Sequence, residues 1–326
     1  MNKLVTILHL LTVCIAATSL AGQASNAAAS SFKITTIDVP GSTQTQAVGI
    51  NSLGQVVGAG GSQGFIDTGG VISTFAFPGS IQAGAFGINS VGLIVGDYVD
   101  AGGQVHGFSR NTSGVFSSID MIGATETRAA GINNGGQVVG EFRDSSGTTH
   151  GFYLTGGAFT TIDVPGATHT EAYGISDTGT IVGLFDDASG RHGFVDSGGS
   201  FTTVDVPGAV LTGLLGISAS GNGFAGGYLD SSGNAHGFLD IGGIFSFIDV
   251  PGAAFTQAFG INDAGQIVGE YGTGGSDYHG FLATPATVPE PETIALLGLG
   301  LGGLALLRRK EKPAMSSLAA RAGALR

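Results

Sequence analysis

One unit of about 43 residues is repeated six times along this chain. Each copy carries three phrases: one like GINNGGQVVGEF, one reading HGF, and one like TTIDVPGA. HGF begins at residues 106, 150, 192, 236 and 279, and QGF begins at residue 63, so the spacing stays between 42 and 44 residues. A constant period of this length indicates a repeat architecture, in which neighbouring units bury a continuous core.

Each unit is predicted to form four short β-strands. Its alternating or β-branched segments are separated by glycine-rich or polar turns, and no stretch follows a helical period. Four strands in about 43 residues match one blade of a β-propeller. The sequence therefore predicts an all-β, six-bladed β-propeller over residues 32–287, with a parallel β-solenoid or a β-prism as the alternative.

The two ends of the repeat array are complementary. The first copy is preceded by a strand-like segment at residues 32–39, whereas the last copy stops after HGFLATPAT and lacks this strand. In a closed ring, residues 32–39 would pair beside residues 279–283 and complete the sixth blade. Because this pairing removes an exposed sheet edge, we predict ring closure rather than an open superhelix.

The charge of the repeat region restricts its partners. Residues 32–287 hold five basic and 21 acidic side chains, a formal charge near −16. Binding to nucleic acid needs clustered Lys and Arg, so nucleic acid is excluded as a partner. Cations and cationic surfaces are the easier partners for such a surface.

The N-terminal residues are typical of a secretory signal peptide. A basic residue, Lys3, precedes a mostly apolar run over residues 4–20, and small residues follow at 22–24. We therefore expect residues 1–24 to be removed during export. The single cysteine of the sequence, Cys14, lies in this segment, so the mature chain is expected to lack disulfides and thiol chemistry.

The histidine of the HGF phrase recurs in five copies: His106, His150, His192, His236 and His279. A residue kept in nearly every unit is expected to serve the unit structurally, and third strands of different blades lie too far apart to share one ion. We therefore predict no metal or cofactor at these positions. The predicted partners are the aspartates of the repeated Ile-Asp pair: Asp38, Asp120, Asp163, Asp205 and Asp249.

Acidic turns follow the second predicted strand of three copies, beginning at Asp144, Asp186 and Asp230. Calcium takes six to eight oxygen ligands, and a single turn supplies too few. Asp and Ser in turns commonly bond their own backbone instead. We predict plain turns, with weak calcium binding as the alternative.

Four polar residues depart from the repeat in the third and fourth copies: Glu126, Arg128, His169 and Glu171. They follow the PGA turn or its equivalent, so we expect them to cluster on one rim and form the candidate binding rim. A histidine beside a carboxylate can perform acid–base chemistry. However, the sequence holds no nucleophile elbow, phosphate loop or zinc-binding helix. We therefore predict no catalytic activity, with a secreted glycan-active hydrolase or lyase as the alternative.

The C-terminal region combines a Pro-Glu-Pro triplet, an apolar run and a basic stop. The residues of the triplet and the stop are Val288, Pro289, Glu290, Pro291, Arg308, Arg309 and Lys310. As a helix, the apolar run over residues 294–307 would be about 21 Å long, shorter than the ~20 residues of a full membrane span. We expect it to anchor the chain transiently in the inner membrane, with the basic residues on the cytoplasmic side.

Triplet, apolar run and basic stop, in this order, resemble the PEP-CTERM sorting signal of Gram-negative bacteria. The resemblance covers residues 288–312, and residues 313–326 form an extension beyond it. It implies processing by an exosortase, export through the inner membrane, and a location at the cell surface or in the extracellular matrix. Because the family is linked to extracellular polysaccharide, it also implies such a polymer as a partner.

The repeats themselves resemble the HAF repeat family of extracellular bacterial proteins, named for a motif like HGF. This resemblance implies an exported repeat protein and brings no established activity with it. Together, these features predict a surface or matrix-associated protein with a structural or binding role.

Overall fold

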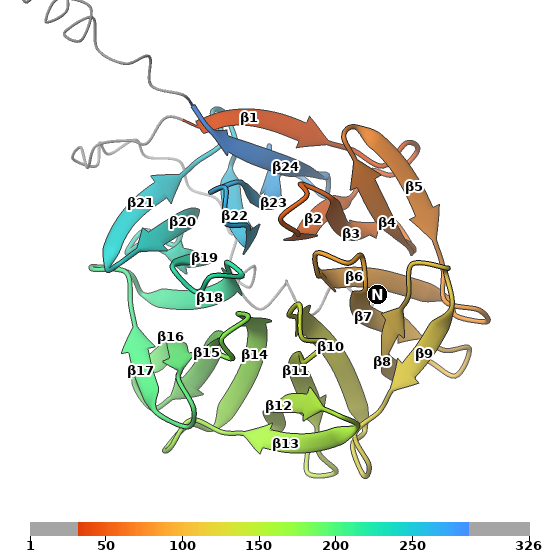
Figure 1. Ribbon diagram of the computed structural model, residues 1–326. Helices are drawn as coiled ribbons and strands as arrows, with labels where there is room; N and C mark the ends of the chain where they lie inside the picture. Colours follow the sequence, from red (N-terminus) through yellow and green to blue (C-terminus); the bar gives the residue numbers. More distant parts are fainter. Residues whose placement is uncertain (1–31, 287–326) are drawn as a thin grey trace, which may run out of the picture. The chain divides into compact units, whose positions relative to one another are not determined.

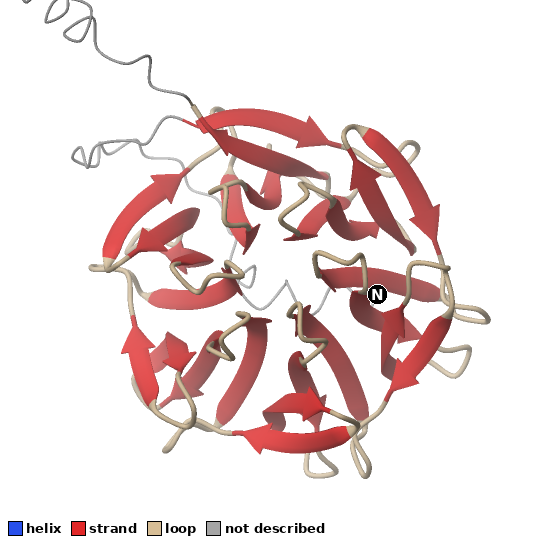
Figure 2. Ribbon diagram, viewed as in Figure 1, coloured by secondary structure: helices blue, strands red, loops and turns tan. Residues whose placement is uncertain are grey.

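The computed structural model describes residues 32–286, which form six four-stranded antiparallel sheets arranged in a ring (Figure 1). These sheets are the blades of a β-propeller. The described residues form strands and turns and include no helix (Figure 2), so no membrane-spanning helix is found among them. The predicted all-β, six-bladed propeller is confirmed, and the solenoid and prism alternatives are wrong. The predicted signal peptide, sorting signal with its apolar helix, and C-terminal extension lie outside the described residues.

Within each blade the strands follow one another from the centre of the ring outward. Blade 1 contains β2 (Thr45–Ile50), β3 (Val56–Gly60), β4 (Gln63–Thr68) and β5 (Val71–Phe75). Blade 2 contains β6 (Gln82–Ile88), β7 (Ile94–Val99), β8 (Val105–Arg110) and β9 (Phe116–Ile119). Blade 3 contains β10 (Glu126–Ile132), β11 (Val138–Arg143), β12 (Thr149–Thr155) and β13 (Ala158–Ile162).

The other three blades repeat this arrangement. Blade 4 contains β14 (His169–Ile175), β15 (Ile181–Asp187), β16 (Gly190–Asp196) and β17 (Phe201–Val204). Blade 5 contains β18 (Leu211–Ile217), β19 (Gly223–Leu229), β20 (Ala235–Ile241) and β21 (Ile244–Ile248). Blade 6 contains β22 (Phe255–Ile261), β23 (Ile267–Gly272), β24 (Tyr278–Pro285) and, from the other end of the chain, β1 (Phe32–Ile37).

The first strand of the chain closes the ring. β1 pairs antiparallel with β24, and its register sets Phe32 opposite Pro285 and Ile37 opposite Gly280. Blade 6 in turn packs against β2 of blade 1. The predicted pairing of the two chain segments is therefore confirmed, and the outer edge of blade 6 is supplied by residues about 250 positions away from its other strands.

The phenylalanine of the HGF phrase fills the centre of each blade. All six of these side chains are completely buried: Phe65, Phe108, Phe152, Phe194, Phe238 and Phe281. The glycine of the preceding strand makes room for the ring. A Cβ atom on Gly140 would lie 2.8 Å from the Phe152 ring and 2.0 Å from the carbonyl oxygen of Arg128. Both contacts are shorter than atoms tolerate, so this position requires glycine.

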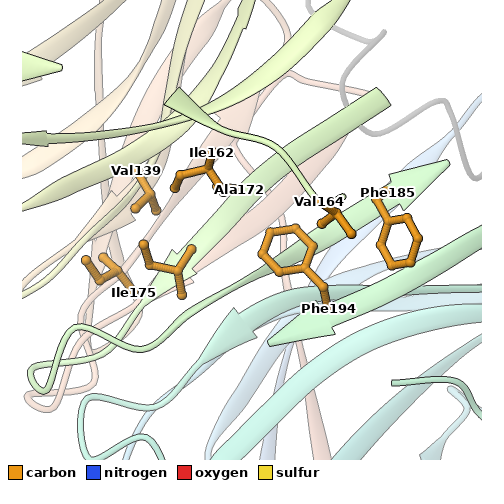
Figure 3. Close-up of a cluster of buried hydrophobic side chains, with 8 residues drawn as sticks. Val139, Ile162, Val164, Ala172, Ile175, Phe185 and Phe194 are labelled. Carbon is orange, nitrogen blue, oxygen red and sulfur yellow. The ribbon is translucent and has the colours of Figure 1, made fainter. Parts of the chain in front are cut away.

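Apolar side chains fill the space between neighbouring blades. Figure 3 shows the cluster between blades 3 and 4, where Val139 and Ile162 of blade 3 meet Ala172, Ile175 and Phe194 of blade 4. These residues are each less than 9% exposed, so every blade completes its core with residues of its neighbour.

The six innermost strands approach one another closely at a second glycine, that of the GIN phrase. A Cβ atom on Gly131 would lie 2.5 Å from the carbonyl oxygen of Tyr173 in the next blade. Two residues further on, side-chain amides link the blades: Asn89 Nδ2 donates to the Asn133 carbonyl at 3.1 Å, and Asn262 Nδ2 donates to the Asn51 carbonyl at 3.0 Å. This second bond joins blade 6 to blade 1.

The up-and-down order of the strands divides the turns between the two faces of the ring. Turns between second and third strands share one face with the turns that connect successive blades. This face carries most of the acidic residues, and we call it the acidic face. Five acidic residues belong to the opposite face, because they lie in first-to-second-strand turns or at the ends of third strands: Asp67, Asp177, Asp196, Asp240 and Asp263.

Candidate functional site

The four residues of the candidate binding rim come from the innermost strands of two adjacent blades. Glu126 and Arg128 belong to β10, and His169 and Glu171 belong to β14. Side chains alternate along a strand, so Glu126 and Arg128 share a face with Ala130, as His169 and Glu171 do with Tyr173. Ala130 and Tyr173 line the central cavity of the ring. All four residues therefore lie between this cavity and the acidic face of the ring.

Arg128 connects three carboxylates of blades 2 and 3. Its guanidinium lies 3.0 Å from Glu126 Oε2, 3.1 Å from Glu141 Oε1 and 3.3 Å from Asp97 Oδ2. Glu141 is its cross-strand neighbour on β11, whereas Asp97 belongs to β7 of blade 2. Burial disfavours the charged guanidinium, but these carboxylates raise the Arg128 pKa above its ordinary value.

The carboxyl group of Asp97 is the most deeply buried group in this cluster. Its side chain is 0% exposed, and desolvation raises its pKa to about 7 even though Arg128 opposes the shift. Asp97 thus changes its charge near neutral pH.

Glu141 and Glu171 form a carboxyl pair across the seam between blades 3 and 4. Burial, followed by the neighbouring Glu171, raises the Glu141 pKa to about 8. Burial also acts on Glu171, but hydrogen bonds from His169 and Tyr173 outweigh it and lower the Glu171 pKa. The opposed shifts favour a neutral Glu141 beside an ionised Glu171.

Glu171 is the centre of a hydrogen-bonded network in blade 4. His169 Nε2 lies 2.7 Å from Glu171 Oε1, and the Tyr173 hydroxyl donates to Glu171 Oε2. Burial and the Glu171 charge raise the Tyr173 pKa well above its ordinary value, so the phenol stays protonated. Arg191, which lies 2.7 Å from Asp186, adds a positive charge nearby and helps to lower the Glu171 pKa.

The prediction that these four residues gather on one rim agrees with this geometry, because Glu141 links Arg128 to Glu171. Their role in binding stays a prediction. Sequence reasoning missed Asp97, Glu141, Tyr173 and Arg191. A signal for two of them was present: the residue after the glycine of the second strand is acidic at Asp97, Glu141 and Glu270 but apolar or glycine in the other three blades.

The five repeated histidines lie on the third strands, away from this cluster. Each Nδ1 atom lies 2.8–2.9 Å from the nearest carboxylate oxygen of its predicted aspartate. Each imidazole also packs on an aromatic ring of the second strand, with centroids 5.0–5.3 Å apart. The predicted histidine–aspartate hydrogen bonds are therefore confirmed in all five copies.

The acidic turns use their carboxylates internally. Asp144 Oδ1 accepts hydrogen bonds from the backbone N–H groups of Ser146 and Thr148 at 2.8 and 2.9 Å, and Asp230 Oδ1 is bonded in the same way. Asp186 differs, because it pairs with Arg191 and the neighbouring Asp187 caps the turn. Within residues 32–286, no three His, Cys, Asp or Glu side chains are arranged to hold one metal ion.

Comparison with known proteins adds one motif. The chain carries a PEP-CTERM protein-sorting motif at residues 287–310. The PEP-CTERM motif is recognised by exosortase and indicates export through the membrane in Gram-negative bacteria. It contains every residue of the predicted triplet and basic stop. The sequence matches no curated protein.

Several solved propellers are similar to this chain in fold. A TolB structure from Agrobacterium tumefaciens has a TM-score of 0.53 at 12% identity, over 74% of this chain and 91% of that one. The SapL1 lectin, in complex with α-methyl fucoside, has a TM-score of 0.50 at 14% identity, over 76% and 98%. At these identities the likeness shows the propeller fold alone.

Proposed function

We propose that the protein is a non-enzymatic binding module of the cell surface or extracellular matrix, and that its partner is an extracellular polysaccharide. The PEP-CTERM motif indicates how the chain is exported; the surface location and the partner are the proposal. The HAF-type identity of the repeats also stays a prediction.

The observation that carries the proposal is the buried charge cluster of blades 2–4. Blade 5 solves the same packing problem without charge, because it sets Gly213 opposite Gly227 where blade 3 sets Arg128 opposite Glu141. Buried charges cost free energy when they are desolvated, so folding alone gives no reason to keep them. Perturbed ionisable groups that gather beside a cavity are more common at binding and catalytic sites.

The chemistry of the cluster suits a polymer of hydroxyl groups. Glu126 and Glu171 can accept hydrogen bonds from sugar hydroxyls, and Arg128 and His169 can donate them. The side chains of Glu126 and His169 are 24% and 23% exposed, so a ligand would contact these two first.

Binding of polysaccharide from the matrix of the native host, measured with the purified protein by calorimetry, tests the proposal. The double variant Glu126→Gln and His169→Gln should weaken binding at least tenfold, because both groups are accessible and the substitutions keep their size. Asp263→Asn, on the opposite face, is the control and should bind normally. Unchanged binding by the double variant, or no binding of any matrix polysaccharide, would contradict the proposal.

Delivery to the surface is tested separately by the intact mass of the protein recovered from its host. A chain that ends near Pro289–Pro291 in the surface or culture fraction supports sorting by exosortase. A chain that retains Arg326 and stays in the membrane fraction would contradict it.

A glycan-active enzyme at the same cluster is the second candidate, favoured by the opposite pKa shifts of Glu141 and Glu171. Opposed shifts of this kind accompany acid–base pairs. A lyase is one such enzyme, in which His169 would take a proton from the sugar. Incubation with matrix polysaccharide should then give unsaturated ends with ultraviolet absorbance, and Glu171→Gln should abolish them. No product from any matrix polysaccharide would end this candidate.

A further inference from the structure

The histidine–aspartate pairs of blades 2–5 contain a second carboxylate that the repeat analysis did not use. In these four blades, the aspartate of the second-to-third-strand turn faces the other imidazole nitrogen. The distances from Nε2 to this carboxylate are 3.6 Å at His106 and His150 and 3.5 Å at His192 and His236. The facing aspartates are Asp100, Asp144, Asp187 and Asp230.

The position of the proton on each imidazole determines which kind of contact this second distance represents. Nδ1 lies at hydrogen-bond distance from a carboxylate, which can only accept, so Nδ1 carries the hydrogen. In the neutral ring Nε2 then presents a lone pair to the second carboxylate. Two acceptors face each other across 3.5–3.6 Å in each of the four blades. Such a gap is favourable when a cation, either a proton or a metal ion, lies in it.

The geometry of the gap matches two ligands of one metal ion. Zinc binds histidine nitrogen and carboxylate oxygen at about 2.0–2.2 Å, which sets two tetrahedral ligands roughly 3.3–3.5 Å apart. The hydrogen bond from Nδ1 to the first aspartate is the support that metal-binding histidines usually have, because it fixes the ring and its tautomer.

Both ligands are held in place and reachable from solvent. The turn carboxylate is fixed by its own backbone, as Asp100 Oδ1 accepts from the N–H groups of Gly102 and Gln104 at 2.8 Å. The imidazoles are 21–25% exposed and the turn carboxylates 32–42%. In blade 4, the Ser189 hydroxyl also lies 3.0 Å from His192 Nε2, where it adds a third oxygen or nitrogen neighbour to the gap.

We propose that blades 2–5 each hold one open site for a borderline divalent metal ion such as zinc, formed by the histidine Nε2 and the turn carboxylate. Each ion has two protein ligands, so its remaining positions are open to water or to an oxygen of another molecule. This agrees with the finding that no three such side chains of the described residues converge on one ion. The four sites form a set of separate sites on the acidic face rather than one shared site.

Two blades of the same chain provide natural controls. Blade 6 keeps His279 and its aspartate, with Nδ1 2.9 Å from Asp38, but no described carboxylate lies within 4 Å of its Nε2. In blade 1, Gln63 replaces the histidine, Ala76 the first aspartate and Gly60 the aromatic residue, and β3 and β4 are joined by a two-residue turn. The chain itself therefore shows that a blade folds without these residues.

Zinc content after equilibrium dialysis of the purified full-length protein tests the proposal. We expect about four equivalents of zinc per chain. Each of the variants Asp100→Asn, Asp144→Asn, Asp187→Asn and Asp230→Asn should lose one equivalent, because asparagine keeps the turn's acceptor but loses the charge. His150→Gln should also lose one equivalent, and the matched variant His279→Gln should lose none.

Three outcomes would overturn the proposal. The first is no retained zinc at millimolar concentration. The second is zinc retained by a folded variant that carries all four Asp→Asn substitutions, which would show adventitious binding elsewhere. The third is equal retention of calcium, unchanged by His150→Gln, which would assign the sites to the turn carboxylates alone.

Discussion

Glu270 should make the seam that closes the ring sensitive to pH. This residue of β23 is 3% exposed, and its Oε2 accepts a hydrogen bond of 2.8 Å from Gln46 Nε2 across the boundary between blades 6 and 1. Burial raises its pKa from 4.5 to about 7, and the bond from Gln46 offsets this only in part. The folded ring therefore favours the neutral carboxyl group.

The sign and size of the effect follow from this shift. Between the two pKa values the folded protein holds a proton that the unfolded chain has released, so stability falls as the pH rises through this window. One pKa unit corresponds to about 1.4 kcal/mol, so a shift from 4.5 to about 7 gives roughly 3 kcal/mol that is lost above neutral pH.

The variant Glu270→Gln removes the ionisation and keeps the shape of the side chain. Its free energy of unfolding should exceed that of the natural protein by roughly 3 kcal/mol at pH 8.5 and by less than about 1 kcal/mol at pH 4.5. In a domain of this size, the larger value corresponds to a rise in Tm of roughly 6–12 °C. Asp97 and Glu141 titrate in both proteins, so their contribution cancels in the comparison.

Thermal unfolding followed by circular dichroism at both pH values measures the difference. Asp277→Asn, at an exposed acidic residue, is the control and should shift Tm by the same small amount at both pH values. An equal shift of Glu270→Gln at both pH values, or a lower Tm at pH 8.5, would refute the reasoning, because Glu270 would then be ionised and stabilised in the folded ring.

Three further predictions concern packing and closure. Phe152→Ala should lower the free energy of unfolding by about 3–5 kcal/mol in urea titrations, as loss of a fully buried ring does; a loss below 1 kcal/mol would contradict the packing. Gly131→Ala should lower the free energy of unfolding by at least about 1–3 kcal/mol, because its Cβ would meet the backbone of the next blade. The control is the turn variant Gly135→Ala, whose Cβ would have a side chain at 3.3 Å as its nearest neighbour and which should cost much less. Equal costs would contradict the close approach of the inner strands. Cysteines at Lys33 and Thr284, which are register partners, should form a disulfide and raise Tm in non-reducing buffer; a pair at Lys33 and Ala283 should not, and its efficient formation would indicate a different register.

The repeat period made much of the fold predictable. Three phrases with one spacing specify four strands per unit and six units, and the segment before the first copy supplies the strand that the last copy lacks. The histidine–aspartate bonds were also predictable, because the two residues lie 13 or 14 positions apart in four copies and ring closure brings Asp38 to His279. Both inferences use phrases that recur along the chain, which the sequence displays directly.

The links of the candidate site lie between units, where the period gives no information. Asp97, Arg128 and Glu171 come from three different blades, and their proximity depends on which faces of the innermost strands meet. The burial that raises the Glu141 pKa depends on the same packing. Sequence reasoning could identify these positions as exceptions to the repeat, but the geometry was needed to connect them.

The closure of blade 6 by β1 also sets a time order for folding. Because a chain is synthesised from its N-terminus, β1 is the first of the 24 described strands to be made, and its partner β24 is the last. Until β24 arrives, β1 has no neighbour, and the charge of Lys33 is the kind of feature that limits pairing with other chains. Contacts between distant parts of a chain form slowly, because a long loop must close first. The ring can therefore close only after all six repeats have been synthesised, just before residues 287–310 with the sorting motif follow.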